Sequence, residues 1–293
     1  MKVALSVWLI VVAAVIVFIA FKAVTSEFEP LKDGRTLELI SWTSLAIIFI
    51  ALGCEFVDST LGMGYGTTLT PILLLFGFHP LQIVPVVLLS ELVTGISAGF
   101  AHHTVGNVDI RPGTRAFKVA IVLAACSIVG TVVAVIIAVS IPKIVLNTWI
   151  GALIFAVGVI ILINVARRTM VRFSWPRVLG IGTVASFNKG MSGGGYGPLV
   201  CGGQLLSGIE GKKAIAITSI AEGLTCIVGV TVYAIAGELI SWRLALLIII
   251  GALFSVPLSA FAVKKVRARP LTIAIGVLTT ALGIFTLAKT YLF

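Results

Sequence analysis

Residues 42–77 read WTSLAIIFIALGCEFVDSTLGMGYGTTLTPILLLFG, and residues 178–208 read VLGIGTVASFNKGMSGGGYGPLVCGGQLLSG. In each stretch an apolar arm leads into Gly-x-Gly-Tyr-Gly and is followed by a shorter apolar arm. An arm of about 11 residues covers about 16 Å as a helix, which is half of the hydrocarbon core of a membrane. We therefore expect two helical hairpins or broken helices, each interrupted by glycine.

The two stretches also align with each other without a gap, at the offset that separates Gly62 from Gly193. The same offset superposes further pairs: Phe56 and Phe187, Gly64 and Gly195, Tyr65 and Tyr196, Gly66 and Gly197, Leu74 and Leu205, Gly77 and Gly208, and Glu91 and Glu222. This match indicates that one unit occurs twice. We expect a first repeat over 42–165 and a second over 178–293, joined by a basic cytoplasmic linker at 166–177.

The rest of the chain is equally apolar. Hydrophobic residues make up 59% of the 293 residues and charged residues 11%, about half the charged fraction of an ordinary soluble domain. Segments long enough to cross a membrane as helices lie at 3–21, 81–101, 119–139, 144–165, 214–236, 244–263 and 271–288. We predict an all-α polytopic membrane protein. Its first segment stands outside the repeats, as an additional N-terminal transmembrane helix within 1–24, followed by an extracytoplasmic loop at 25–41.

Loop charges orient the predicted helices. Lys and Arg concentrate in 102–118, 166–177 and 263–270, which are therefore predicted to be cytoplasmic. The first and the third of these loops have counterparts in the other repeat, at 237–243 and 140–143, that carry fewer such residues, so we expect an inverted-topology repeat. The N-terminus is predicted to be cytoplasmic and the C-terminus extracytoplasmic. The net charge of +10 then reflects topology, and no nucleic-acid partner is expected.

The glycine-rich breaks are the first candidates for a binding site. Inverted repeats with broken helices are the usual architecture of secondary transporters, whose substrate lies near the membrane midplane. Each break would expose backbone N–H groups where a short helix begins, at Thr67 or Pro198, and such groups attract anions. The alternative is that the glycines only permit close helix packing. The predicted substrate-binding residues are Gly62, Gly64, Tyr65, Gly66, Thr67, Asn188, Lys189, Ser192, Gly193, Gly194, Gly195 and Tyr196.

Four ionisable residues, Asp58, Glu91, Lys189 and Glu222, stand inside apolar sequence, where an unpaired charge costs about 2.5–3.5 kcal/mol or more. Asp58 and Lys189 occupy equivalent repeat positions and would meet if the hairpin tips meet. Either they form a neutralising ion pair, or Lys189 binds the substrate anion while Asp58 tunes it or carries a proton. The two glutamates would either relay a proton, because a carboxyl in low dielectric tends to hold its proton, or brace a hairpin as neutral acids.

Residues typical of enzymes give weaker signals. The four cysteines lie in apolar stretches without paired spacing, so we expect them to be buried, with no metal site and no cofactor. The segment from Gly190 to Gly193 matches the GxSG motif of an intramembrane serine protease, with Ser192 as nucleophile. That chemistry needs a base within hydrogen-bond reach of the serine. All three histidines, His79, His102 and His103, lie in the first repeat at predicted helix ends or in loops, so we expect no enzyme.

The motifs also resemble a known family. Asp58-Ser-Thr-Leu-Gly-Met-Gly-Tyr-Gly, Thr70-Pro71 and the second-half Gly-Gly-Gly-Tyr-Gly-Pro look like those of the TauE/SafE sulfite-exporter family, also called the sulfite and sulfonate permease family. The resemblance covers about residues 42–290. It implies a carrier for sulfite or small organosulfur anions in the bacterial inner membrane. Members of the family differ in substrate and direction, so the resemblance leaves the anion and the direction open.

Taken together, these features predict a secondary transporter of sulfite or a sulfonate that works by alternating access. The expected partners are a small sulfur-containing anion, the lipid bilayer and, where carboxyls couple movement, protons. A passive anion channel with the same pore geometry remains an alternative. The sequence makes no prediction of oligomeric state.

Overall fold

The computed structural model describes residues 17–23, 41–62, 64–166, 175–206, 209, 211–237, 240–263 and 268–292. After a helical segment at 17–23, ten helices follow in this part of the chain: α2 (Trp42–Leu61), α3 (Tyr65–Leu75), α4 (Pro80–Thr104), α5 (Arg115–Ser140), α6 (Lys143–Ala166), α7 (Trp175–Ser192), α8 (Tyr196–Leu206), α9 (Gly211–Ile235), α10 (Trp242–Ala262) and α11 (Ala268–Leu292). The prediction of an all-α protein is confirmed.

Most of the predicted N-terminal helix within 1–24 lies outside the described residues, as do nearly all of the loop 25–41 and most of the linker 166–177. The six other uninterrupted segments correspond to α4, α5, α6, α9, α10 and α11, with ends that differ by a few residues. The helix α4 begins where expected because the side chain of His79 accepts a hydrogen bond from the N–H of Leu81 and that of Gln82 accepts one from the N–H of His79.

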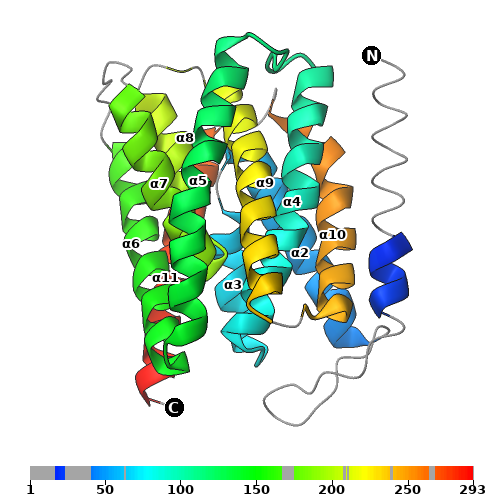
Figure 1. Cartoon of the computed structure of the whole chain (residues 1–293), viewed down its shortest axis with the longest axis vertical. Helices are drawn as coiled ribbons and strands as arrows, with labels where there is room; N and C mark the ends of the chain where they lie inside the picture. Colours follow the sequence, from blue (N-terminus) through cyan, green and yellow to red (C-terminus); the bar gives the residue numbers. More distant parts are fainter. Residues whose placement is uncertain are drawn as a thin grey trace.

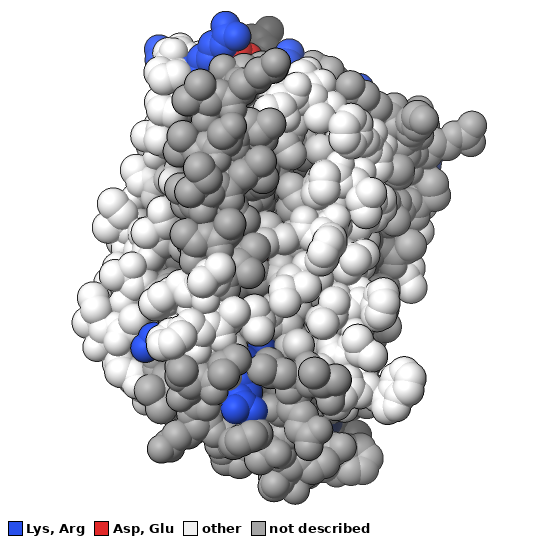
Figure 2. Space-filling view, turned by 90° about the vertical axis from the view of Figure 1, so that its right-hand side faces the viewer, with Lys and Arg blue, Asp and Glu red and all other residues white. Residues whose placement is uncertain are grey.

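The surface of the molecule is that of a membrane protein. Six helices in the described part of the chain are long and apolar enough to cross a bilayer, among them α2, α4 and α10. Large side chains such as Phe49 and Phe254 are 69% and 67% exposed, which suits lipid. Figure 2 shows a broad uncharged band between Lys and Arg side chains that lie toward the two ends. We conclude that the chain is a multi-pass membrane protein.

Helices that are equivalent in the two halves make equivalent contacts. The helix α2 packs along α10, and α7 packs in the same way along α5. Two further pairs, α4 with α9 and α6 with α11, each join equivalent helices of the two halves. In Figure 1, α4 runs from the lower to the upper end of the bundle, whereas α9 runs from the upper to the lower end. Each of these helices therefore packs against a helix of the other half of the chain.

The broken segments fold back toward the end at which they began. In Figure 1, α2 begins and α3 ends toward the lower end, while α7 begins and α8 ends toward the upper end. The short helices begin at Tyr65 and Tyr196, two residues before the predicted starts at Thr67 and Pro198. Each short helix thus already includes the tyrosine and the last glycine of its break, Tyr65 and Gly66 in α3 and residues 196 and 197 in α8.

Candidate functional site

Each break begins with a glycine that ends the preceding helix in the left-handed conformation. The φ angle is 71° at both Gly62 and Gly193. The N–H of Gly62 donates to the carbonyl of Asp58 at 2.5 Å, and that of Gly193 donates to the carbonyl of Lys189 at 2.8 Å. Only glycine adopts this conformation without steric cost. The two equivalent glycines thus give the two halves the same bend.

The two breaks cross in direct backbone contact. A Cβ atom built on Gly66 would overlap the carbonyl oxygen of Gly193, and one built on Gly194 would lie 2.6 Å from the amide nitrogen of Thr67. No side chain fits between the two segments at these points. The close packing that was the alternative explanation for these glycines is present, and it joins the two halves of the chain.

Two reciprocal hydrogen bonds fasten this crossing. The hydroxyl of Thr70 on α3 donates to the carbonyl of Ser192 at 3.1 Å, and the thiol of Cys201 on α8 donates to the carbonyl of Leu61 at 3.4 Å. These four residues form equivalent pairs at the repeat offset. Each short helix therefore satisfies the last carbonyl of the long helix in the opposite half, a carbonyl that would otherwise lack a partner.

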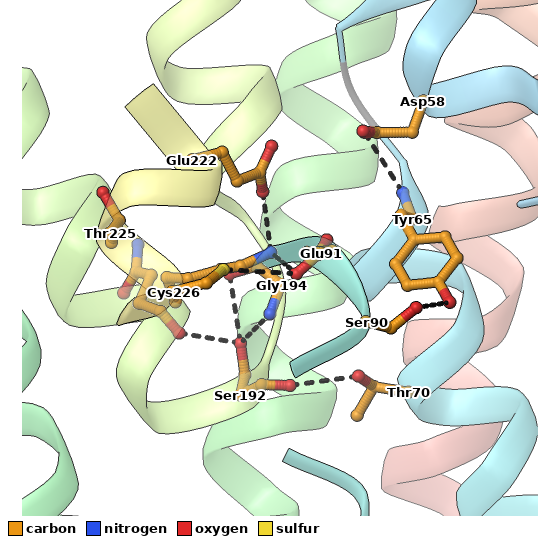
Figure 3. Close-up of polar contacts among 12 residues, drawn as sticks. Asp58, Tyr65, Thr70, Ser90, Glu91, Ser192, Gly194, Glu222, Thr225 and Cys226 are labelled. Atoms are coloured by element: carbon orange, nitrogen blue, oxygen red, sulfur yellow. Dashed lines mark hydrogen bonds and ion pairs between the residues drawn. The ribbon is translucent and has the colours of Figure 1, made fainter. Parts of the chain in front are cut away.

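The crossing of α4 and α9 brings their buried carboxyls to the same place. A Cβ atom on Gly95 of α4 would lie 2.7 Å from the carbonyl oxygen of Ser219 on α9. Glu91 lies one turn before Gly95, and Glu222 lies one turn after Ser219 on α9. Because the two backbones approach so closely, the two glutamates enter one centre from different helices (Figure 3).

Lys189 lies between these two glutamates. Its ammonium contacts a carboxyl oxygen of Glu91 and donates to Oε1 of Glu222 at 2.7 Å. The three side chains are 0%, 3% and 5% exposed in the order Lys189, Glu91, Glu222. A buried ammonium needs such partners because desolvation is costly. This cluster, named here the central ion cluster, joins helices α4, α7 and α9.

Of the two alternatives for Asp58 and Lys189, the ion pair between them is not formed among the described residues, because Lys189 contacts the two glutamates. Oδ1 of Asp58 instead accepts a hydrogen bond from the backbone N–H of Tyr65 at 3.3 Å (Figure 3). That N–H belongs to the first turn of α3, where a carboxylate is favoured by the helix dipole. The aromatic ring of Tyr65 is buried, and its hydroxyl pairs with Ser90 Oγ at 2.7 Å. Asp58 therefore holds the first break together.

Several buried polar atoms beside the crossing have no hydrogen-bond partner within the described residues. They are Oγ1 of Thr67, Oε1 of Glu91 and the hydroxyl oxygen of Tyr196. Buried polar groups are normally satisfied, so such a group calls for an explanation. Thr67 and Tyr196 stand in the first turns of α3 and α8. Thr67 and Glu91 therefore keep unused hydrogen-bonding capacity beside the crossing.

Ser192 is held by the local backbone. Its hydroxyl donates to the carbonyl of Asn188 at 2.8 Å and accepts from the N–H of Gly194 at 3.1 Å. Gly195 completes this turn with a φ angle of 80°, as Gly64 does in the first break with 130°. These bonds give Ser192 a structural role at the end of α7.

The histidines His102 and His103 form hydrogen bonds with backbone carbonyls and with an asparagine, not with Ser192. Nε2 of His102 contacts the carbonyl oxygen of Ser59 at 3.0 Å, and its Nδ1 contacts the side chain of Asn107 at 2.9 Å. His102 is fully buried in the last turn of α4, so it lies at a helix end as predicted. It links α4 to the end of α2. His103 contacts the carbonyl oxygen of Val108.

Glu55 is a buried carboxyl that is missing from the predicted site. It is 1% exposed; its Oε1 accepts from Ser59 at 2.5 Å, and its Oε2 has no hydrogen-bond partner among the described residues. It stands one turn before Asp58 on α2. An ionisable residue in apolar sequence is a signal by itself, but the position equivalent to Glu55 is the uncharged Ser186. A search restricted to matched positions does not find it.

Comparison with known proteins matches this architecture to transporters. The family model described as sulfite exporter TauE/SafE matches residues 45–286. The chain is also 26% identical over 255 residues to the probable membrane transporter protein YtnM of Bacillus subtilis (strain 168), covering 79% of this chain and 78% of that protein. No solved structure matches the chain. Because the family model spans most of the sequence, including both glycine breaks and the central ion cluster, the chain belongs to the TauE/SafE sulfite exporter family of membrane transporters.

Proposed function

We propose that this protein is a secondary transporter that moves sulfite or a small organosulfur oxyanion, such as a sulfonate, across the bacterial inner membrane. The observation that carries the proposal is the fully buried ammonium of Lys189, held between Glu91 and Glu222. An ammonium offers three donors to an oxyanion. The description of the family as sulfite exporters supports the same class of substrate.

The groups around the crossing supply the remaining contacts for an oxyanion. The hydroxyls of Thr67 and Tyr196 have no partner among the described residues. The first turns of α3 and α8 also present backbone N–H groups with a favourable dipole. An anion at this place would lie beside the crossing of the two breaks, next to the central ion cluster, so both halves of the chain would bind it. Asn188 completes the proposed shell, whereas Gly193 and Gly194, whose N–H groups are already bonded to Lys189 and Ser192, shape it by letting the breaks approach.

Charge balance in the central ion cluster suggests how protons enter. Lys189 carries one positive charge, whereas Glu91 and Glu222 together carry two negative charges when both are ionised. An incoming anion must displace a carboxylate from the ammonium, and a proton on that carboxyl removes the competition. Anion and proton then bind together, so anion binding strengthens as the pH falls. This sign follows from linkage, because the bound state holds one more proton.

The mechanism proposed is alternating access, and the packing of helices of one half against helices of the other half supports it. We assign the halves to inverted-topology repeats, with the N-terminus cytoplasmic and the C-terminus extracytoplasmic. Supporting this assignment are the opposite directions of α4 and α9 in Figure 1 and the loop charges. One hairpin then faces each side of the membrane, as in other transporters with inverted repeats.

The direct test is uptake of radioactive sulfite by proteoliposomes that contain the purified protein. Wild-type protein is expected to show saturable uptake, which rises when the outside is made acidic. Lys189→Met is expected to lower uptake at least tenfold, because the substrate loses its cationic partner. Lys212→Met, at an exposed lysine of α9, is the matched control and should transport normally.

The outcomes of this test separate the alternatives. Full uptake by Lys189→Met would refute the role of the central ion cluster. Flux that rises linearly with sulfite and does not follow a proton gradient would identify a passive channel. Wild-type protein that moves none of sulfite, sulfoacetate or isethionate would refute the proposed function as a whole.

A second prediction concerns the pH dependence of uptake. In Glu222→Gln an uncharged amide replaces the carboxyl that contacts Lys189. Binding of the anion then no longer requires a proton to bind to residue 222. We expect the ratio of variant to wild-type affinity for sulfite to rise up to tenfold per pH unit toward alkaline pH. Comparison at equal pH cancels the titration of sulfite itself.

Glu55→Gln is the matched control, because Glu55 is an equally buried carboxyl with no described contact to Lys189. Its affinity ratio to wild type should stay constant with pH. A flat ratio for Glu222→Gln would contradict coupling through this glutamate. A variant-to-wild-type affinity ratio that depends on pH for Glu55→Gln would indicate that the coupling proton binds to Glu55 on α2.

A further inference from the structure

A second positively charged site lies away from the central ion cluster. It is a cavity of about 400 Å³ between the end of α3, the beginning of α6 and the end of α11. Its volume equals the share of about a dozen water molecules in the liquid, so a hydrated ion fits. The lining includes Lys143, Asn147, Thr286, Lys289 and Thr290. Among the described residues that line the cavity there is no Asp or Glu. This cavity is named here the lower cavity.

Lys289 determines the sign of the potential in the lower cavity. Its ammonium donates to the carbonyls of Leu74 and Leu75 at 3.3 and 3.4 Å. These carbonyls end α3 and form the negative pole of that helix, so Lys289 neutralises this part of the wall. An ammonium has three donors, and two are used here. One donor therefore remains for a ligand.

The opposite wall is positive as well. Lys143, Ile144 and Asn147 come from the first turns of α6, and this end of a helix favours an anion. The field of Lys143 reaches His79, whose pKa is lowered by partial burial and by that ammonium. The cavity thus lies between two lysines and the positive pole of a helix.

Thr286 provides an independent indication of a ligand. It is 4% exposed and lines the lower cavity, and its Oγ1 has no hydrogen-bond partner within the described residues. The neighbouring Thr290 shows the usual arrangement in a helix, since its hydroxyl donates to the carbonyl of Thr286 at 2.8 Å. A buried hydroxyl that makes no such bond keeps its hydrogen available.

We infer that the lower cavity binds a small oxyanion such as sulfate, sulfite or a sulfonate, held by Lys289, Lys143 and Thr286. It lies one short helix away from the glycine crossing, at the end of the molecule where α3 ends and α11 ends (Figure 1). In the proposed function it is the vestibule through which the anion reaches or leaves the central ion cluster. That role rests on the proposed function, whereas anion binding does not.

The test measures the potential inside the lower cavity directly. Ile144 lines the cavity and is 52% exposed, so Ile144→Cys offers a thiol for labelling. Cys54, Cys201 and Cys226 are buried, and Cys126→Ser removes the remaining natural thiol. Purified protein is treated with methanethiosulfonates that carry either a sulfonate or a trimethylammonium group.

We expect the anionic reagent to react about tenfold faster than the cationic reagent, because two lysines line the cavity. Sulfate, added at constant ionic strength with gluconate as the balancing anion, should slow the anionic reagent. Adding Lys289→Met should bring the two rates within about twofold of each other. Lys212→Met, at the opposite end of the molecule, should leave them unchanged.

Thr286→Val keeps the charge and the shape, so it tests binding without the risk of misfolding. It is expected to raise the sulfate concentration needed for half-protection about fivefold or more. Thr290→Val is its control, because that hydroxyl already donates within its helix. Equal rates for the two reagents, or protection unaffected by Thr286→Val, would overturn the site.

These readouts are independent of transport. Protection by sulfate in protein that transports none of sulfite, sulfoacetate and isethionate would support the lower cavity and refute the proposed function. Sulfite transport by protein that sulfate does not protect would support the proposed function and refute anion binding in the lower cavity.

Discussion

Gly66→Ala is expected to prevent the protein from reaching its folded state. The added methyl group would overlap the carbonyl oxygen of Gly193, which belongs to the backbone of the other break. Backbone atoms in a fixed crossing cannot rotate away as a side chain can, so the segments must separate. We expect a loss of more than about 4 kcal/mol, beyond the range of ordinary substitutions. The measurement is the yield of monodisperse protein in detergent and its thermal unfolding midpoint.

Gly53→Ala is the matched control. Gly53 lies on the same helical hairpin, in α2, and a Cβ atom there has nothing within 4 Å. Alanine is the better helix former, by up to about 1 kcal/mol, so this variant should be at least as stable as the wild type. A Gly66→Ala protein with a normal yield and midpoint would show that the two breaks do not cross as described.

Lys189→Met is expected to destabilise the protein by about 3–5 kcal/mol. The substitution leaves Glu91 and Glu222 buried next to each other without their cation, and removal of one partner from a buried ion pair costs that much. Thermal unfolding of the purified variant measures the loss. The midpoint should recover partly at acidic pH, because protonation of the carboxyls removes their repulsion.

The neutral triple variant Lys189→Met/Glu91→Gln/Glu222→Gln separates stability from transport. It carries no uncompensated charge, so it should regain most of the lost stability. Sulfite uptake should stay at least tenfold below the wild type, since the cationic partner is still missing. A triple variant as unstable as the single one would contradict the charge argument. Recovery of uptake would show that the cluster only braces the helices.

Much of the fold follows from local sequence. The length of each apolar segment predicts the uninterrupted helices, because a chain that crosses a bilayer must satisfy its backbone N–H and C=O groups by hydrogen bonds within the segment, as a helix does. The pattern Gly-x-Gly-Tyr-Gly predicts both breaks, and the φ angles at Gly62 and Gly193 explain why glycine is needed there. The matched spacing of the breaks also predicts that the two halves have similar folds.

The partners within the site could not be predicted in the same way. Alignment of the halves shows which residues are equivalent, but equivalent residues need not touch. Asp58 and Lys189 are equivalent, yet Lys189 contacts glutamates of α4 and α9 because those helices cross at glycine. Glu55 was missed because its counterpart is uncharged. The contact between the breaks depends on long-range packing that no local pattern contains.

The reciprocal hydrogen bonds at the crossing are equivalent in position but unequal in strength. Thr70 donates through oxygen, whereas Cys201 donates through sulfur, which is the weaker donor. The hydrogen bond from α3 to α7 is therefore stronger than the hydrogen bond from α8 to α2. Under the proposed alternating access, this difference between one hydroxyl and one thiol would favour the orientation in which the weaker hydrogen bond, donated by Cys201, is broken.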